Sequence, residues 1–252
     1  MKISIITPSY NQGLFIEETI KSVLSQNYPD LEYIVVDGGS TDNTLAILKK
    51  YTHKLKWISE KDKGQTDAIN KGLKMSSGDI VAFINSDDVY LPGTLRKISK
   101  IFKRNKNVHW LSGDYVIIDQ DGKKIQFFIV WYKKILRLFP FFSMLSIANF
   151  VIQPSTFWRK NIVKEIGFFD ERLRYTMDYD YWLRVIQKYP LYIIHEPLSL
   201  FRIHKLSKGG SQFEKQFQEE FQVIKKYTSN KFLQYLHAFH NFFIINIYKW
   251  IK

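Results

Sequence analysis

A short apolar run, Ile80 to Ile84, ends close to two adjacent carboxylates, Asp87 and Asp88, and this feature limits the possible folds more than any other. Paired negative charge at the end of a buried strand is costly unless a cation is held there. Oxygen ligands suit Mg²⁺ or Mn²⁺, which take one or two protein carboxylates and complete their shell with water and phosphate oxygens. The alternative is a helix N-cap, where Asp is also common. The pair alone leaves both interpretations open.

The first half of the chain alternates strand patterns with helix patterns. Strand-like runs cover Lys2 to Thr7, Leu31 to Val36, Leu55 to Ser59 and Ile80 to Ile84. Apolar residues recur at helical spacing between them, as in Ile16, Ile20, Val23 and Leu24. This alternation predicts an α/β fold with a mostly parallel central sheet flanked by helices.

Acidic or glycine-rich residues follow the second, third and fourth of these strands. They are Asp37 with Gly38, then Glu60 or Asp62, then Asp87 with Asp88. Open α/β sheets bind ligands at the carboxyl ends of their strands. We therefore expect these acidic groups to lie in one crevice.

Composition limits the class of protein and its partners. With 252 residues, of which 45% are hydrophobic, the chain can bury a full core. It has no cysteine, which excludes disulfides and thiolate metal sites, and Met1-Lys2 leads directly into a strand, which leaves no room for a signal peptide. The formal net charge of +13 favours a polyanionic partner. Since no nucleic-acid-binding motif is present, we expect this partner to be an anionic membrane surface. The lack of a signal peptide predicts a cytoplasmic location.

The segment from Leu138 to Trp158 has no charged residue and nominally has the length of a membrane span. Its prolines and polar residues argue against a crossing, which would also separate the two halves of the site. We predict a helix lying on the membrane surface instead, with core packing as the alternative. Its basic, aromatic and apolar residues are Trp131, Tyr132, Lys133, Lys134, Arg137, Phe139, Phe141 and Phe142.

The C-terminal segment, residues 211–252, is predicted to be an amphipathic helical tail. Its apolar residues recur at helical spacing: Phe232, Leu236, Phe239, Phe243, Ile247 and Trp250. The tail can lie on a membrane, dock on the rest of the chain, or join a second copy in a homo-oligomer. The sequence does not separate these three possibilities.

Three motifs, in their order and spacing, resemble family 2 glycosyltransferases of the GT-A fold. They are Pro8-Ser9-Tyr10-Asn11, Val36-Asp37-Gly38-Gly39-Ser40-Thr41-Asp42 and Asn85-Ser86-Asp87-Asp88. The resemblance covers roughly residues 1 to 205. It implies a GT-A domain over residues 1–210, with a nucleotide-sugar-binding half (1–110) and an acceptor half (111–210).

The resemblance implies an inverting, metal-dependent transferase that moves one sugar from a nucleotide-diphosphate sugar. Asp88 would bind Mg²⁺ or Mn²⁺, with His204 from Phe201-Arg202-Ile203-His204 completing the metal or diphosphate site. The donor-binding residues would be Thr7, Tyr10, Asp37, Asp67 and Asp87. A surface or capping role is the alternative for Asp67, which falls near the start of a helix.

The segment Met177-Asp178-Tyr179-Asp180 resembles the acidic motif that carries the family's catalytic base. Asp178 fits that role best, and Asp180 is the alternative. A carboxylate beside the acceptor hydroxyl can take its proton as the sugar carbon is attacked. Capping a helix, or pairing with Arg174 and Arg184, are the structural alternatives for these two aspartates.

The resemblance also implies a setting for the enzyme. The motif and membrane spans of processive synthases are not evident, so we expect single-sugar transfer to a lipid-linked or glycan acceptor in bacterial surface-polysaccharide synthesis, at the inner face of the cell membrane. A non-catalytic nucleotide-sugar-binding or scaffold subunit is the main alternative. A nucleotidyltransferase is a weaker one, because Pro8 to Gly13 offers one glycine and no basic residue.

Overall fold

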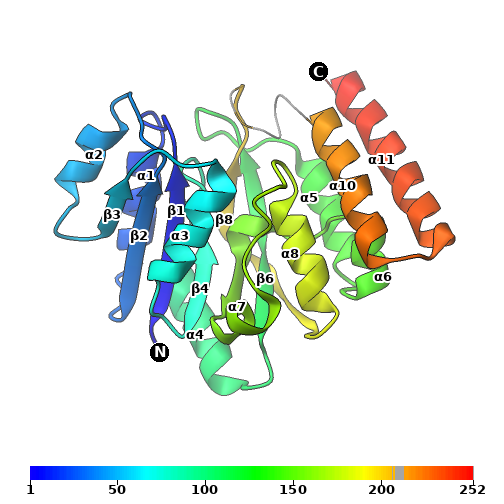
Figure 1. The fold of residues 1–252 in the computed structure, drawn as a ribbon, viewed down its shortest axis with the longest axis horizontal. Helices are drawn as coiled ribbons and strands as arrows, with labels where there is room; N and C mark the ends of the chain where they lie inside the picture. The colour runs from blue at the N-terminus through cyan, green and yellow to red at the C-terminus, as the bar shows by residue number, and fades with distance from the viewer. Residues whose placement is uncertain (206, 208–212, 252) are drawn as a thin grey trace.

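The computed structural model describes residues 1–205, 207 and 213–251. Figure 1 shows a central sheet flanked by helices, with the C-terminal helices at the end of the molecule opposite α2. In the described chain the strands are β1 (Ile3–Ser9), β2 (Leu31–Asp37), β3 (Lys56–Ser59), β4 (Ile80–Phe83), β5 (Val89–Tyr90), β6 (Trp110–Ile118), β7 (Thr156–Arg159) and β8 (Leu191–Arg202). The helices are α1 (Ile16–Leu24), α2 (Thr44–Lys50), α3 (Gln65–Met75), α4 (Thr94–Arg104), α5 (Phe127–Leu136), α6 (Phe142–Ile147), the short η1 (Gln153–Ser155), α7 (Asn161–Ile166), α8 (Met177–Ile186), α10 (Phe213–Tyr227) and α11 (Lys231–Ile251).

The sheet confirms the predicted α/β architecture. The described strands form one sheet in the order β3-β2-β1-β4-β7-β6-β8-β5. The first four in this order are mutually parallel, and β7 joins antiparallel between β4 and β6. Strands β1 and β4 are buried along their whole length, as parallel strands covered on both faces must be.

Register places the ends of the first three strands at one edge of the sheet. Ser9 pairs with Asp37, and Asp37 pairs with Ser59. Helix α3 packs closely on β1 because Gly72 faces Ile6, where an added Cβ would lie 2.4 Å from the Ile6 Cγ2 atom. This close packing sets the position of the loop before α3 relative to the strand ends.

The interpretation of Arg137 as a surface group for a membrane is wrong. Its side chain is 2% exposed and lies against the backbone of β6 and β8. The guanidinium donates to the carbonyl oxygens of Ser112, at 2.8 Å, and Gly113, at 2.6 Å, and pairs with Asp114 at 3.5 Å. The charge stays buried because carbonyl dipoles and a carboxylate compensate it. Arg137 therefore anchors the end of α5 to the sheet.

The C-terminal helices pack against α8 and α6, so the tail docks on the rest of the chain. Helix α10 lies beside α8, and α11 lies beside α10 and α6 (Figure 1). The inward face of α11 is polar: the His237 Nδ1 atom lies 2.9 Å from the Ser146 carbonyl oxygen, and Asn241 contacts His237 Nε2 at 2.8 Å. The predicted apolar stripe faces outward, with Phe239 56% and Phe243 58% exposed. The side chain of Trp250 lies outside the described residues.

Candidate active site

A cavity of about 1100 Å³ opens at the carboxyl ends of β1, β2 and β4. Residues from both halves of the chain line it, and they include Tyr10, Asp62, Asp87, Asp178 and His204. The expected crevice therefore exists, and it brings together acidic groups that are distant in sequence.

The loops after β2 and β3 form one wall of this cavity. Gly38 lies so close to Asp62 that an added Cβ would stand 2.6 Å from the Asp62 Oδ2 atom. Asp62 in turn accepts a hydrogen bond from the Gly64 amide at 2.8 Å. Tyr10 is 59% exposed and lines the same cavity. An exposed ring and a carboxylate that line the same cavity suit a planar ligand group with hydrogen-bond donors.

Asp37 and Thr7 lie behind this wall and do not line the cavity. Asp37 is fully buried, and it accepts hydrogen bonds from the Ser40 amide at 2.9 Å and from the hydroxyls of Ser40, at 2.5 Å, and Ser59, at 2.7 Å. The Thr7 hydroxyl lies 3.1 Å from that of Tyr33. Both side chains hold the strand ends together beneath the cavity.

Asp67 stands in the first turn of α3 and also does not line the cavity. It accepts a hydrogen bond from the Lys63 amide at 3.0 Å and pairs with Lys71 at 3.3 Å. Burial alone would raise the pKa of Asp67, but these contacts lower it below its ordinary value. Asp67 therefore shapes the cavity-lining loop that contains Asp62.

Asp88 is fully buried, and two hydrogen bonds join Asp88 and the neighbouring Asp87 to Arg202 at the end of β8. Its Oδ1 atom accepts the Arg202 backbone amide at 2.9 Å, and the Arg202 Nε donates to the Asp87 carbonyl oxygen at 2.9 Å. Burial, reinforced by the charge of Asp87, raises the pKa of Asp88. Asp88 does not line the cavity. We call these two hydrogen bonds the Asp88–Arg202 clamp.

The clamp places Asp87 and His204 together on the cavity wall. The Asp87 Oδ2 atom lies 3.0 Å from His204 Nε2, and both residues line the cavity. The His204 ring packs on Phe15 with centroids 4.7 Å apart. One carboxylate and one imidazole, held rigidly, thus face the same space.

Among the residues that the structure describes, no three His, Asp or Glu side chains gather closely enough to hold a metal ion by themselves. The pair of Asp87 and His204 supplies two donor atoms. Magnesium and manganese commonly accept so few protein ligands where phosphate oxygens and water complete the shell.

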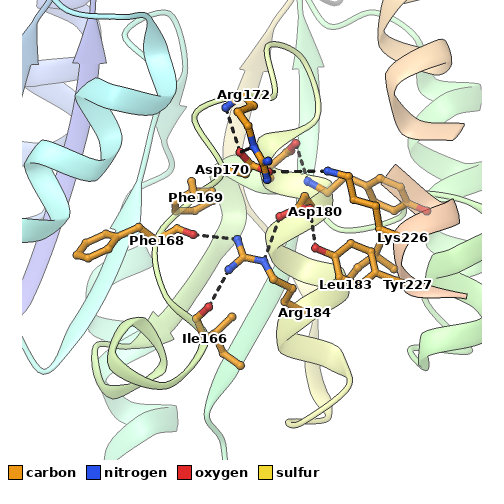
Figure 2. A network of polar contacts seen from close by, with 12 residues as sticks. Ile166, Phe168, Phe169, Asp170, Arg172, Asp180, Leu183, Arg184, Lys226 and Tyr227 are labelled. Atoms are coloured by element: carbon orange, nitrogen blue, oxygen red, sulfur yellow. Dashed lines mark hydrogen bonds and ion pairs between the residues drawn. The ribbon is translucent and has the colours of Figure 1, made fainter. Parts of the chain in front are cut away.

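Asp178 and Asp180 have different surroundings although both lie in the first turn of α8. Asp178 lines the cavity, and its Oδ1 accepts the Tyr179 amide at 2.8 Å. Asp180 is buried away from it, paired with Arg184 at 3.0 Å and hydrogen-bonded by the Tyr227 hydroxyl at 2.6 Å (Figure 2). The pairing of Asp180 with Arg184 confirms one of the structural alternatives.

Helices α5 and α10 supply the rest of the wall near Asp178. Lys133, which the sequence suggested for a membrane surface, lines the cavity, and burial lowers its pKa. Gln216 also lines it and donates to Glu220 at 3.2 Å. Glu220 is 3% exposed, and burial, with a smaller effect of the Asp178 charge, raises its pKa to about 7.

Sequence reasoning missed the contribution of α10 to this site. Gln216, Glu219 and Glu220 follow Asp178 by about 40 residues, and no motif marks them. The run Gln216 to Glu220 reads as an ordinary solvated helix face. The one available signal was that Glu219 and Glu220 are adjacent in a helix that also contains several aromatic residues, so that one of the two carboxylates must lie close to the apolar face.

Comparison with known proteins agrees with this arrangement. The model of the family described as glycosyl transferase family 2 matches residues 4–167. An uncharacterized glycosyltransferase of Rickettsia typhi, RT0329, is 30% identical over 252 residues, which cover 95% of this chain and 77% of the relative. The chain therefore belongs to glycosyl transferase family 2 and is a glycosyltransferase.

Two further comparisons concern a relative named for polysaccharide biosynthesis and a solved structure with the same fold. A putative teichuronic acid biosynthesis glycosyltransferase of Bacillus subtilis, TuaG, is 37% identical over 131 residues, which cover 50% of this chain and 52% of TuaG. The mannosyltransferase PcManGT from Pyrobaculum calidifontis, solved with GDP-Man and Mn²⁺, superimposes with a TM-score of 0.73 at 17% identity, over 95% of this chain and 69% of that one. The predicted GT-A fold is thereby confirmed.

Glu220 gives a testable pH dependence of stability. The unfolded side chain ionises near pH 4.5, whereas the folded one keeps its proton up to about pH 7. Between these values the folded state binds more protons, so the free energy of unfolding falls as pH rises, by about 3 kcal/mol for such a shift. Urea unfolding from pH 5 to pH 8 measures it. We expect Glu220→Gln to remove this fall, and an unchanged slope in that variant would contradict the assignment.

Proposed function

We propose that this glycosyltransferase is an inverting, metal-dependent enzyme that moves one sugar from a nucleotide-diphosphate sugar to a membrane-held, lipid-linked glycan acceptor. The single observation that carries the proposal is that the Asp87–His204 pair and Asp178 line one cavity. Its volume, about 1100 Å³, accommodates a nucleotide sugar together with part of an acceptor. The assignment of TuaG to teichuronic acid synthesis supports a role in polysaccharide assembly.

The donor nucleoside would lie against Tyr10 and Asp62. Tyr10 offers an exposed ring, and Asp62 offers a carboxylate on the same wall. Thr7, Asp37 and Asp67 would act indirectly, because their hydrogen bonds fix the strand ends and the loop that carries Asp62. The nucleotide-sugar ligand of PcManGT supports this class of donor.

Asp87 and His204 would hold Mg²⁺ or Mn²⁺ together with the donor diphosphate. Both side chains line the cavity and lie next to each other, so the Asp87 carboxylate and the His204 imidazole would be the two protein ligands of one cation. Such a cation, when bound, neutralises the negative charge that develops on the leaving diphosphate. Asp88 would contribute through the Asp88–Arg202 clamp, which orients both ligands.

Asp178 would be the base. It stands on the cavity wall formed by the second half of the chain, and it would accept the proton of the acceptor hydroxyl as that oxygen attacks the sugar carbon from the side opposite the diphosphate. Asp180 is unsuited to this role because Arg184 and Tyr227 occupy its oxygens. Lys133 lies near enough that the charge of Asp178 opposes part of the lowering of the Lys133 pKa by burial.

Replacing Asp178 by Asn tests the assignment of the base. We expect nucleotide-diphosphate release from the donor to fall about a thousandfold, since an amide cannot accept the proton. Donor binding, measured by thermal stabilisation, should stay unchanged. The assay follows product release from a panel of UDP-, GDP- and dTDP-sugars with Mg²⁺ or Mn²⁺.

Asp180→Asn is the matched control from the same helix turn. It should keep turnover near that of the unsubstituted protein and lower the thermal midpoint, because it weakens a buried ion pair. Full activity of Asp178→Asn would remove that residue from the role. Binding of donors without any turnover in the unsubstituted protein would favour the non-catalytic alternative.

Substitutions of Asp87 and of Asp88 should have different effects on metal binding. Asp87→Asn should abolish the extra thermal stabilisation that Mg²⁺ or Mn²⁺ adds to a nucleoside diphosphate, since it removes a ligand. Asp88→Asn should keep that metal-dependent increment on a less stable protein. The reverse outcome would return the metal-ligand role to Asp88.

Membrane association is supported by the outward face of α11. Rings of Tyr235, Phe239 and Phe243 stack along it with centroids 6.4 Å apart, all exposed, while the polar His237 and Asn241 point inward. A helix whose outer face lies in water normally has polar residues on that face and apolar residues on the inward face. Together with the net charge of +13, this face would lie on an anionic membrane.

Helix α5 would extend the same kind of surface. Phe127, Phe128 and Trp131 are each at least 60% exposed, and Tyr132 stacks on His240 of α11 with centroids 6.0 Å apart. In the part of the chain that the structure describes, no helix has both the length and the apolarity for a membrane crossing. Contact at the membrane surface would bring the cavity to a lipid-linked acceptor.

Vesicle sedimentation tests this surface. The unsubstituted protein should bind vesicles containing phosphatidylglycerol more tightly than pure phosphatidylcholine vesicles. Phe239→Ser with Phe243→Ser should weaken binding about a hundredfold, because each of the two buried rings contributes well over 1 kcal/mol. Leu14→Ser, at an 86% exposed position on the donor side, is the control and should bind normally. A dimer that the double variant disrupts, without vesicle binding, would assign the surface to a second copy instead.

A further inference from the structure

Glu219 of α10 binds the segment that leads into α8. Its Oε1 atom accepts the Arg174 amide at 3.0 Å, and its Oε2 atom accepts the amides of Tyr175, at 2.7 Å, and Thr176, at 2.8 Å. The Thr176 hydroxyl also donates to Oε2 at 2.8 Å. One carboxylate thus takes four hydrogen bonds from three consecutive residues.

These hydrogen bonds fix the residues just before α8 from another helix, and one of them satisfies the amide of the N-cap residue Thr176. The first amides of a helix have no partner within it, and a nearby side chain normally satisfies them. The N-cap residue Thr176 makes no such side-chain bond to α8. The carboxylate of Glu219 instead stands before the helix N-terminus, where negative charge is favourable. The segment it fixes ends one residue before Met177 and two before Asp178.

Two further contacts of α10 with this region involve residues away from the cavity wall. The Tyr227 hydroxyl bonds Asp180, and Lys226 lies 3.8 Å from Asp170 (Figure 2). Neither Asp170 nor Asp180 lines the cavity, whereas Arg174, Tyr175 and Asp178 do. Tyr227 therefore docks α10 on α8, while Glu219 fixes residues that form the site.

We propose that Glu219 is a positioning residue, which holds the segment Arg174–Thr176 so that Asp178 faces the acceptor hydroxyl in the cavity. This inference rests on the proposed role of Asp178. Glu219 lies beyond residues 4–167, the part that the family model matches, so the chain completes its site with a helix from outside that part. Loss of this contact lets Asp178 move, and small displacements of a reacting group are costly in rate.

Glu219→Ala tests the proposal. We expect kcat for nucleotide-diphosphate release to fall about tenfold to a hundredfold, with the KM for the donor unchanged, since Glu219 does not line the cavity. Glu219→Gln keeps one acceptor oxygen and should fall less. Hydrogen exchange of the amides of residues 174–176 should quicken in both variants. If Glu219→Ala does not fold, Glu219→Gln gives the same two measurements.

Two controls separate positioning from general loss of stability. Tyr227→Phe removes a docking contact of α10 and should lower the thermal midpoint while changing kcat less than twofold. Gln218→Ala, at an exposed neighbouring position, should also change kcat less than twofold. Equal losses of kcat in Tyr227→Phe and Glu219→Ala, or unchanged kcat in Glu219→Ala, would overturn the proposal. An unsubstituted protein with no turnover would instead refute the proposed function, and that outcome is visible before any variant is made.

Discussion

The Asp88–Arg202 clamp is the interaction on which the geometry of the site depends. It joins the turn after β4 to the end of β8, two segments 114 residues apart in sequence. The Thr19 hydroxyl donates to the Asp88 carbonyl oxygen at 2.7 Å, and Glu18 pairs with the Arg202 guanidinium at 2.5 Å, so α1 is tied to the same point. Asp87 and His204 meet because the backbone on either side of them is fixed in this way.

The sequence could predict the fold and the edge of the sheet that carries the site. Strands buried on both faces produce continuous apolar runs, and the helices between them keep a 3.6-residue period, so both signals are local. Parallel register then requires Gly38, Asp62 and Asp87 to share one edge, and all three line the cavity. Each of these steps needs only neighbouring residues and the geometry of a sheet.

The sequence could not distinguish the carboxylate that faces the cavity from the one beside it. Asp87 and Asp88 have the same chemistry, and their exposure differs because β8 covers Asp88 with a backbone amide from Arg202. Asp37 is similar, since the Ser40 and Ser59 hydroxyls enclose it. Arg137 looked like a surface charge because nothing local reveals the carbonyl oxygens of β6 that accept its hydrogen bonds. Burial of a charged group depends on partners from distant segments.

Both walls of the cavity combine residues from the part that the family model matches, 4–167, with residues from beyond it. The wall beside Asp87 takes His204 from beyond that part. The wall beside Asp178 takes Lys133 from within it, and Asp178, Gln216 and the segment held by Glu219 from beyond it. A donor diphosphate needs the same contacts whatever sugar is moved, whereas acceptors vary in shape. Changes in α10 can therefore alter the wall beside Asp178, which we propose faces the acceptor, while the clamp stays intact, because the hydrogen bonds of Glu219 and Tyr227 involve neither Asp88 nor Arg202.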